Sequence, residues 1–312
     1  MDKKKDLTPR IILLGSITED IIDLPEGTTF RSLGGILYQA SVFCAFKKPV
    51  GLWAHLGKNL VNEFRRLTSG WRSLSRAAVK VVSWPGNRVH LYYPPRGERE
   101  EILENVVPPL NLKNLARRFS AGDFIMAVIN SGFDFRREDW QWLVKRIDCP
   151  TWLDIHSLVL EQILGQPRRY RSLPDWPDWA RGVTFLQANQ QELACLLGNP
   201  QEKPTLRQMI DFSQQAASFG VEAVVVTLGR AGVFLGEGNK GEILAPPVAV
   251  EPVDTTGCGD VLAAATVIGL KEGQPIRDAL RQGMELAVVA AQVKGVEAIF
   301  QELKNYLDNL II

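Results

Sequence analysis

Short apolar runs alternate with longer segments of helical pattern along most of the chain. The runs are rich in Val, Ile and Leu, as expected for buried strands, and the segments between them carry apolar residues at helical spacing. The predicted strands are 11–14, 50–56, 124–129, 151–155, 183–186 and 223–228, and the predicted helices are 36–46, 136–147, 190–197, 205–219, 261–271 and 275–293. This alternation predicts an α/β fold, with a mainly parallel sheet between two layers of helices and a binding crevice beyond the carboxyl ends of the strands.

Two strand-like segments, 21–33 and 79–103, interrupt the alternation. The second contains the sequence Trp-Pro-Gly-Asn at 84–87, which is a strong turn signal. Together the two segments predict a small sheet inserted into the main fold. So few residues cannot bury enough apolar surface to fold alone, and we therefore predict one domain over residues 1–312.

The charged residues of the chain are almost balanced, with 36 Lys and Arg against 35 Asp and Glu. A chain with a net charge close to zero has no overall electrostatic attraction to nucleic acid or to an anionic membrane, so neither is expected as a partner and a small molecule fits better. The apolar run nearest the N-terminus, 11–14, is too short for a signal peptide or a membrane span. We therefore expect a cytoplasmic protein.

The cysteines and histidines are widely separated, so their spacing indicates neither disulfide pairing nor a zinc site nor a Ser-His-Asp arrangement. The cysteines are expected to be reduced, and the histidines are expected in the core or on the surface. These residues are Cys44, Cys149, Cys195, Cys258, His55, His90 and His156.

The most informative segment is 254–260, Asp-Thr-Thr-Gly-Cys-Gly-Asp, which leads into an apolar run of helical composition. Its glycines permit a tight turn, and the free N–H groups of a helix start there would bind an anion. Asp260 would lie in the first turn, where a carboxylate can take a proton from an attacking hydroxyl. Asp and Gly at a helix start also occur for structural reasons alone. A phosphate beside a base nevertheless indicates phosphoryl transfer.

Two other nucleotide-binding motifs fail to match. The pattern G-x-G-x-x-G of dinucleotide-binding folds has Leu262 where Gly or Ala is required. A Walker A loop at 51–57 has five residues between its glycines instead of four, and Asn59 stands where Ser or Thr is needed.

Segment 254–260 resembles the second signature of the ribokinase-like (phosphofructokinase B, PfkB) family of carbohydrate kinases, Asp-Thr-x-Gly-x-Gly-Asp. Segments 15–20, 33–35, 189–192 and 227–232 are similar to further family motifs and occur in the family order. The resemblance covers nearly the whole chain. It implies a ribokinase-like three-layer α/β/α domain, with the small sheet as a lid over the substrate. In the family the lid often provides the dimer surface, so a homodimer through the lid is an expectation.

The resemblance also implies roles for individual residues. Asp260 corresponds to the catalytic base, and the amides of Gly257, Cys258 and Gly259 to the anion hole. Substrate binding is implied for Thr18, Asp20, Gly34, Gly35 and Gln39, and nucleotide binding for Asn189, Thr227, Gly229 and Gly232. The implied cofactors are ATP and Mg²⁺, with Glu192 acting on the magnesium through water. In some members a monovalent cation such as K⁺ binds at the positions of Asp254 and Thr256 together with a later loop, here 293–295.

Spacing alone gives Asn189 and Glu192 a second interpretation, because an N-cap acceptor followed three residues later by Glu is a capping box. Cys258 carries a further expectation. A thiol at a helix N-terminus should have a lowered pKa, which would make Cys258 the most reactive cysteine of the chain.

The substrate stays open at this point, because Gln39 stands where many sugar kinases of the family have Asn and Lys58 stands where Asp is usual. The first hypothesis is that the protein is a kinase that phosphorylates a hydroxyl of a sugar, a sugar acid or a cyclic polyol. The second is a nucleoside kinase, with Phe30, Trp53 or Tyr92 against the base. The third is a ligand-binding or regulatory protein without catalysis, against which the intact signature around Asp260 argues.

Overall fold

The computed structural model describes residues 10–24, 27–94, 100–115, 119–248 and 250–310. Within these ranges the centre of the molecule is a nine-stranded sheet. Its strands lie in the order β13 (Lys240–Leu244), β12 (Val233–Glu237), β11 (Ala223–Thr227), β10 (Phe185–Asn189), β9 (Thr151–Asp154), β8 (Phe124–Val128), β1 (Ile11–Leu14), β4 (Val50–Gly57) and β5 (Leu74–Val82). All neighbours from β5 to β11 are parallel, and β12 and β13 add an antiparallel hairpin at one edge. This confirms the α/β fold with a mainly parallel sheet.

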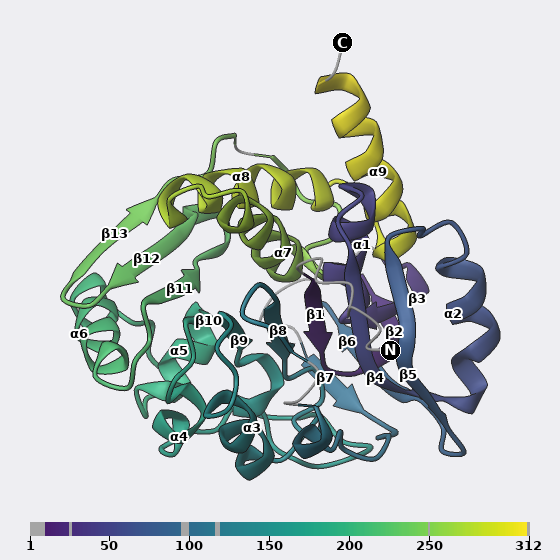
Figure 1. Ribbon diagram of the computed structural model, residues 1–312, viewed down its shortest axis with the longest axis horizontal. Helices are drawn as coiled ribbons and strands as arrows, with labels where there is room; N and C mark the ends of the chain where they lie inside the picture. Colours follow the sequence, from purple (N-terminus) through teal and green to yellow (C-terminus); the bar gives the residue numbers. More distant parts are fainter. Residues whose placement is uncertain (1–9, 25–26, 95–99, 116–118, 249, 311–312) are drawn as a thin grey trace, which may run out of the picture.

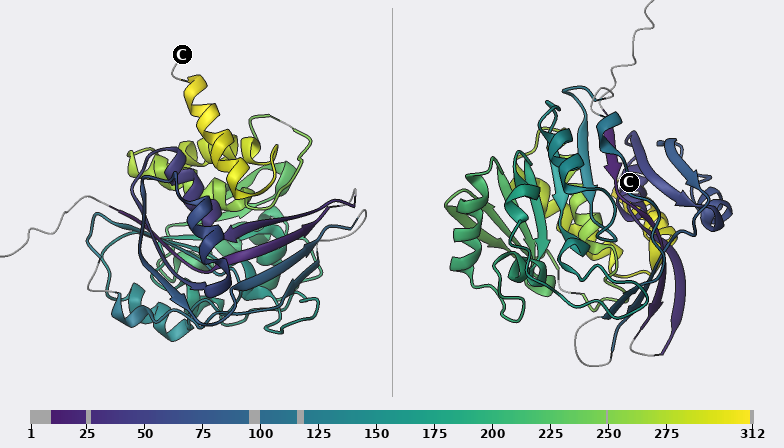
Figure 2. Two further views of the ribbon diagram at one scale, coloured as in Figure 1. Left: turned by 90° about the vertical axis from the view of Figure 1, so that its right-hand side faces the viewer. Right: turned by 90° about the horizontal axis from the view of Figure 1, so that it is seen from below.

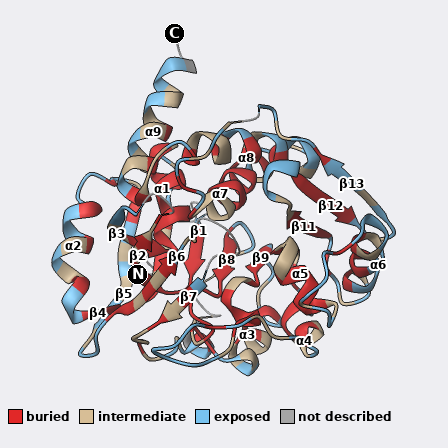
Figure 3. Cartoon of the chain, turned by 180° about the vertical axis from the view of Figure 1, so that it is seen from behind, coloured by how far each residue is buried: buried red, intermediate tan, exposed pale blue. Residues whose placement is uncertain are grey.

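Helices cover both faces of this sheet (Figure 1). One layer contains α1 (Leu37–Ala45), α2 (Val61–Leu67), α7 (Cys258–Lys271), α8 (Ile276–Ala290) and α9 (Gly295–Leu310). The other contains α3 (Arg137–Val144), α4 (Trp176–Ala180), α5 (Gln190–Leu196) and α6 (Leu206–Ala217). Successive strand residues point to opposite faces, so Ile11 and Leu13 of β1 pack in the first layer and Ile12 and Leu14 in the second. The central strands are accordingly buried throughout (Figure 3).

Helix α7, like α1, is a core helix, and its residues from Val261 to Gly269 are all buried. A helix that is apolar around its whole circumference belongs in a core, and α7 packs against both α1 and α8. The signature at 254–260 therefore leads into the interior of the molecule. The residues of its first turn, 257–260, are half-buried.

A second, four-stranded sheet lies at the edge of the main domain (Figure 2) and is called the lid here. Its strands lie in the order β3 (Thr29–Gly35), β2 (Ile17–Asp23), β6 (Asn87–Tyr92) and β7 (Glu100–Leu103). It has a small apolar core of its own, formed by Ile22, Leu24, Val89, Leu91 and Leu103. The small sheet predicted from the interruptions at 21–33 and 79–103 is therefore present, while positions 25–26 and 95–99 lie outside the described residues.

The structure differs from the prediction in three segments. Residues 79–82 belong to β5, which pairs with β4 in the large sheet, so the prediction that they lie in the lid was wrong. Helix α9 was not predicted, although its buried Val296, Ile299 and Leu303 follow helical spacing. Segment 168–181, to which the sequence pattern assigned neither a helix nor a strand, contains α4, whose Trp176 and Trp179 are buried in the core. Among the described residues, no helix is both long and apolar enough to cross a membrane.

Candidate active site

Asp20, in β2 of the lid, has a carboxylate that is held from two sides. Thr18 Oγ1 donates a hydrogen bond to Asp20 Oδ1 over 2.6 Å, and the hydroxyl of Tyr38 in α1 donates to Oδ2 over 3.3 Å. The neighbouring strand makes room with Gly34, where a Cβ would lie 1.8 Å from Asp20 Oδ2. A larger residue at that position would displace the carboxylate. Asp20 is therefore a fixed hydrogen-bond acceptor.

The start of α7 has the geometry expected of an anion site. Gly257 is the N-cap with φ +82°, in the left-handed region that glycine adopts without strain, and no side chain caps the helix. A Cβ at Gly257 would lie 2.2 Å from Tyr38 Cδ1, so only glycine fits this turn. The Cys258 N–H also donates to Thr255 O over 3.2 Å. No side chain competes for the remaining first-turn N–H groups, which together with the positive end of the helix dipole can bind an anion.

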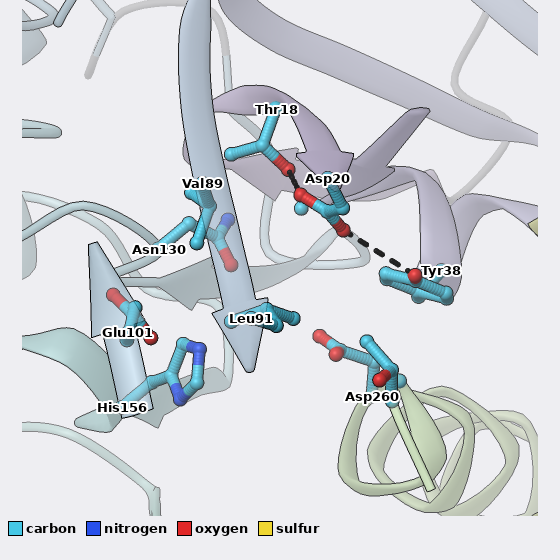
Figure 4. Close-up of a pocket in the computed structure, with 12 residues that line it drawn as sticks. Thr18, Asp20, Tyr38, Val89, Leu91, Glu101, Asn130, His156 and Asp260 are labelled. Carbon is cyan, nitrogen blue, oxygen red and sulfur yellow. Dashed lines mark hydrogen bonds between the residues drawn. The ribbon is translucent and has the colours of Figure 1, made fainter. Parts of the chain in front are cut away.

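Asp260 lies in the first turn of α7. Its carboxylate faces the same cavity as that of Asp20 (Figure 4). Burial raises the pKa of the Asp260 carboxyl to about 7; the charge of His156 opposes the increase, and those of Asp20 and Glu192 add to it. Within the described part of the chain, Asp260 Oδ1 has no hydrogen-bond partner. A carboxylate with a pKa near neutrality and an unoccupied oxygen is suited to general-base catalysis.

His156 also belongs to the site, although it was expected in the core or on the surface. It follows β9 at the carboxyl edge of the sheet and has φ +34°, which is uncommon for a residue other than glycine. Its Nδ1 lies 3.3 Å from Glu192 Oε1. Burial would lower the pKa of His156, but the hydrogen bond to Glu192 and the charges of Glu192, Asp154 and Glu101 raise it to about 9. The imidazole is therefore cationic at neutral pH.

Asn189 and Glu192 form the capping box that their spacing predicts. The Asn189 side chain accepts from the Glu192 backbone N–H over 2.8 Å, and Glu192 Oε2 accepts from the Asn189 backbone N–H over 2.7 Å. Glu192 Oε1 accepts from the Asn189 side-chain amide over 2.7 Å. Both carboxylate oxygens thus have protein donors, so Glu192 suits a water-mediated contact with a metal better than a direct one.

Two hollows meet at Asp260. The first, called the acceptor cavity, has a volume of about 60 Å³ and a mainly polar lining that comes from the lid and the main domain. Its lining residues are Thr18, Asp20, Gly35, Tyr38, Val89, Leu91, Glu101, Asn130, His156, Thr256, Gly257 and Asp260.

The second, called the donor cleft, has a volume of about 680 Å³, within the usual range for small-molecule sites. One wall is apolar and contains Pro246, Val248, Val250, Leu262, Met284, Ala287 and Val288. The cleft shares His156, Thr256, Gly257 and Asp260 with the acceptor cavity. A ligand in one hollow would therefore contact a ligand in the other at Asp260.

The structure brings most of the residues singled out in the sequence to these hollows. The acceptor cavity is lined by Thr18, Asp20, Gly35 and Asp260, and the donor cleft by Asn189, Glu192, Thr227, Gly229, Gly232, Thr256, Gly257, Cys258, Gly259 and Asp260. Gly34 lines neither hollow itself, but its lack of a side chain leaves room for the carboxylate of Asp20.

The role expected for Gln39 stays a prediction. Both amide atoms of Gln39 are buried without a hydrogen-bond partner among the described residues. Its side chain is wholly buried in α1 and lies outside the lining of the acceptor cavity. Tyr38, one residue earlier, lines the cavity instead. Because successive helix residues are about 100° apart around the axis, the two side chains point in different directions.

Tyr38, Glu101, Asn130 and His156 line the acceptor cavity and were not identified from the sequence. Asn130 and His156 follow β8 and β9, and polar residues directly after apolar runs are the signal that could have found them, since ligands bind beyond the carboxyl ends of such strands. Glu101 lies inside a lid strand, where no local pattern distinguishes it.

The prediction that the Cys258 thiol has a lowered pKa was wrong. Burial raises the pKa of the Cys258 thiol to about 12, and the charges of Asp254 and Asp260 add to the increase. Burial and these charges raise the pKa of the thiol by more than the helix dipole lowers it. Cys258 is nevertheless the most accessible cysteine, because Cys44, Cys149 and Cys195 are buried.

Asp254 has one carboxylate oxygen that accepts from the Thr256 backbone N–H over 2.9 Å and a second, Oδ2, that is buried without a hydrogen-bond partner among the described residues. Burial raises the pKa of Asp254, while hydrogen bonds from Thr256 and Gly295 and the charge of Lys294 lower it. In the part of the chain that the structure describes, no three His, Cys, Asp or Glu side chains lie close enough to hold a metal ion by themselves.

Comparison with known proteins agrees with this geometry. The model of the pfkB family of carbohydrate kinases matches residues 164–302. A cytidine kinase of Thermococcus kodakarensis is 37% identical over 282 residues, which cover 89% of this chain and 94% of the relative. A ribokinase of Schizosaccharomyces pombe is 31% identical over 133 residues, and this match spans only 42% of each protein.

The fold is shared with solved structures as well. The structure of Arabidopsis thaliana ribokinase complexed with ribose and ATP superimposes with a TM-score of 0.73 at 19% identity and covers 96% of this chain and 99% of that chain. Similarity at this identity shows a common fold, and the cytidine kinase shows common family membership over nearly the whole length. The chain therefore belongs to the pfkB family of carbohydrate kinases.

Proposed function

We propose that this protein transfers the γ-phosphoryl group of ATP to a hydroxyl of a sugar or cyclic polyol. The observation that carries the proposal is the junction of the two hollows at Asp260 and the start of α7. One hollow is small and polar and the other is large with an apolar wall. Their junction has a base on one side and an anion site on the other.

The donor cleft suits a nucleotide. Its apolar wall fits a purine, and the cleft ends at the N-terminus of α7, where the amides of Gly257, Cys258 and Gly259 would bind phosphoryl oxygens. A bound Mg²⁺ would neutralise charge on the phosphates. Asn189 and Glu192 line the same cleft and would hold the ion through water. The buried, unpartnered Oδ2 of Asp254 fits a monovalent cation beside the anion hole.

In the proposed reaction the acceptor hydroxyl lies against Asp260, which removes its proton as the oxygen bonds to the γ-phosphorus. The bond between that phosphorus and the bridging β-phosphate oxygen breaks, and ADP leaves. The α7 amides stabilise the negative charge of the group in transit. Asp20 and Asn130 orient the remaining hydroxyls. A closed lid would exclude water, which would otherwise compete as the acceptor.

A sugar or polyol is favoured over a nucleoside by the lining of the acceptor cavity. The aromatic residues considered as supports for a base all lie elsewhere. Trp53 stacks on Phe119 with ring centroids 4.8 Å apart, Phe30 packs against the lid core, and Tyr92 is 46% exposed. Cytidine remains the second candidate because of the sequence similarity to a cytidine kinase along nearly the whole chain.

The test is a transfer assay with ATP, Mg²⁺ and ribose, fructose, myo-inositol or cytidine, in which products are identified by mass spectrometry. We expect a product heavier by one phosphoryl group with at least one of the three polyols. Repeating the assay with pyrophosphate in place of ATP tests the donor, and the apolar wall of the donor cleft predicts that pyrophosphate is the poorer one. Phosphorylation of cytidine alone would select the second candidate, and ADP release without a phosphorylated product would contradict both.

A further inference from the structure

Glu101 brings a carboxylate from the lid into the acceptor cavity. It lies in β7 opposite Leu91 of β6, and its side chain is buried. Figure 4 shows Glu101 and Asp20 on different sides of the cavity, with Asn130 and Leu91 between them. The cavity therefore has fixed oxygen acceptors on two sides.

Arg168 holds this carboxylate from behind. The Arg168 side chain is fully buried, and its Nη1 donates to Glu101 Oε1 over 2.9 Å. Its other donors bond to backbone carbonyls of the main domain, namely Nε to Glu161 O over 2.8 Å and Nη2 to Ser131 O over 3.0 Å and to Ser157 O over 3.4 Å. Burying a guanidinium is costly unless all its donors are satisfied, and here each nitrogen has an acceptor.

The backbone around Arg168 extends the lid sheet. Arg168 N–H donates to Glu101 O over 2.9 Å, Gly165 N–H donates to Leu103 O over 2.8 Å, and Ile102 and Pro167 form an antiparallel bridge. The loop that carries Arg168 thus pairs with β7 like a further strand. This pairing fixes both the backbone and the side chain of Glu101 relative to the main domain.

We propose that Glu101, positioned by Arg168, is a second substrate-binding carboxylate, which accepts hydrogen bonds from acceptor hydroxyls on the side of the ring away from Asp20. This inference rests on the proposed transfer to a polyol. A carboxylate fixed by a buried arginine is an acceptor of constant position, and hydroxyl groups are the donors that a neutral polyol supplies. Asp20 and Glu101 together then set which face and which hydroxyl of the ring are presented to Asp260.

The test compares Glu101→Gln with Glu104→Gln. Glu104 lies just beyond β7 but pairs with Arg88 and His90 at the surface, so it is a matched control. With the best of the four acceptors in the transfer assay, we expect Glu101→Gln to raise the acceptor KM by about 10- to 100-fold, as for loss of a hydrogen bond to a charged group, and to leave the ATP KM within about twofold. Glu104→Gln should keep both KM values.

Glu101→Gln leaves the Arg168 charge buried without its partner, which can destabilise the fold. The double variant Glu101→Gln/Arg168→Met removes that charge, and we expect it to recover the melting temperature without recovering the acceptor KM. Deoxy analogues then identify the hydroxyl: one of them should lower the activity of the unmodified protein and cause no further loss in Glu101→Gln.

The outcomes separate this inference from the proposed function. If the unmodified protein phosphorylates a polyol and Glu101→Gln keeps its acceptor KM, only the role of Glu101 is overturned. The same conclusion follows if the double variant recovers the acceptor KM together with stability. If the unmodified protein phosphorylates none of the acceptors, the proposed function and this inference both fail.

Discussion

The two hollows of the site differ in where along the chain their residues come from. Nearly all residues of the donor cleft follow position 150, and most lie within the matched family segment, 164–302. Nine of the twelve residues that line the acceptor cavity precede that segment, and six of those nine lie in lid strands. The family model therefore matches the half of the chain that supplies most of the donor cleft. The similarity to the cytidine kinase extends over 89% of the chain and so includes the half that supplies most of the acceptor cavity.

We therefore expect substitutions in the two hollows to have separable effects. Substitutions at the junction should lower kcat, those in the acceptor cavity should raise the acceptor KM, and those in the donor cleft should raise the ATP KM. The expected effects decrease in that order.

At the junction, Asp260→Asn should lower kcat by about 10²- to 10⁴-fold, because the amide keeps the shape of the carboxylate and removes the base. Binding of ATP, measured by calorimetry with a non-hydrolysable analogue, should change little. Near-native turnover in this variant would remove Asp260 from the mechanism.

The pH dependence should report the same carboxylate. The pKa of Asp260 is raised to about 7, chiefly by burial, and a base acts only when deprotonated. The value of kcat/KM for the acceptor should therefore be constant well above pH 7 and fall about tenfold per pH unit below it. A profile that stays flat down to pH 5 would be incompatible with Asp260 as the base.

In the acceptor cavity, Asp20→Ala should raise the acceptor KM by about 10- to 100-fold, because it removes a charged hydrogen-bond acceptor. The ATP KM should stay within about twofold, since Asp20 does not line the donor cleft. Equal increases in both KM values would mean that the two hollows are not separable.

In the donor cleft, Ala287→Phe should have the converse effect. Ala287 lies on the cleft side of α8, and a phenyl ring there would occupy space assigned to the nucleotide. We expect the ATP KM to rise by about tenfold with the acceptor KM unchanged, an amount typical of a changed steric fit in an apolar pocket. Glu285→Gln, an exposed change on the same helix, is the control and should leave both constants unaltered.

Sequence alone predicted the parts of the molecule that depend on local pattern. The buried parallel strands follow from apolar runs, and the helix that starts after Gly257 follows from the glycines and the apolar run behind them. The acceptor cavity was predicted only in part, because its residues come from distant strands. Glu101 reaches the cavity through pairing of β6 with β7 and through the buried Arg168, and neither interaction leaves a local signal.

Two predictions show how packing limits what sequence can tell. Gln39 was placed in the site because it stands where many sugar kinases of the family have Asn; its side chain is buried and does not line the acceptor cavity, whereas Tyr38 does. The thiol of Cys258 was judged from the helix dipole alone, whereas burial and two nearby carboxylates raise its pKa. Both properties depend on packing around the residue rather than on its neighbours in sequence.

The central claim is that donor and acceptor meet at Asp260 and exchange the phosphoryl group directly. The stereochemistry at phosphorus tests it most directly. With ATP carrying a γ-phosphoryl group made chiral by oxygen isotopes, and with the best acceptor from the transfer assay, one in-line displacement predicts inversion of configuration in the product. Retention would contradict the account, because it requires two displacements and hence a phosphorylated intermediate on the protein.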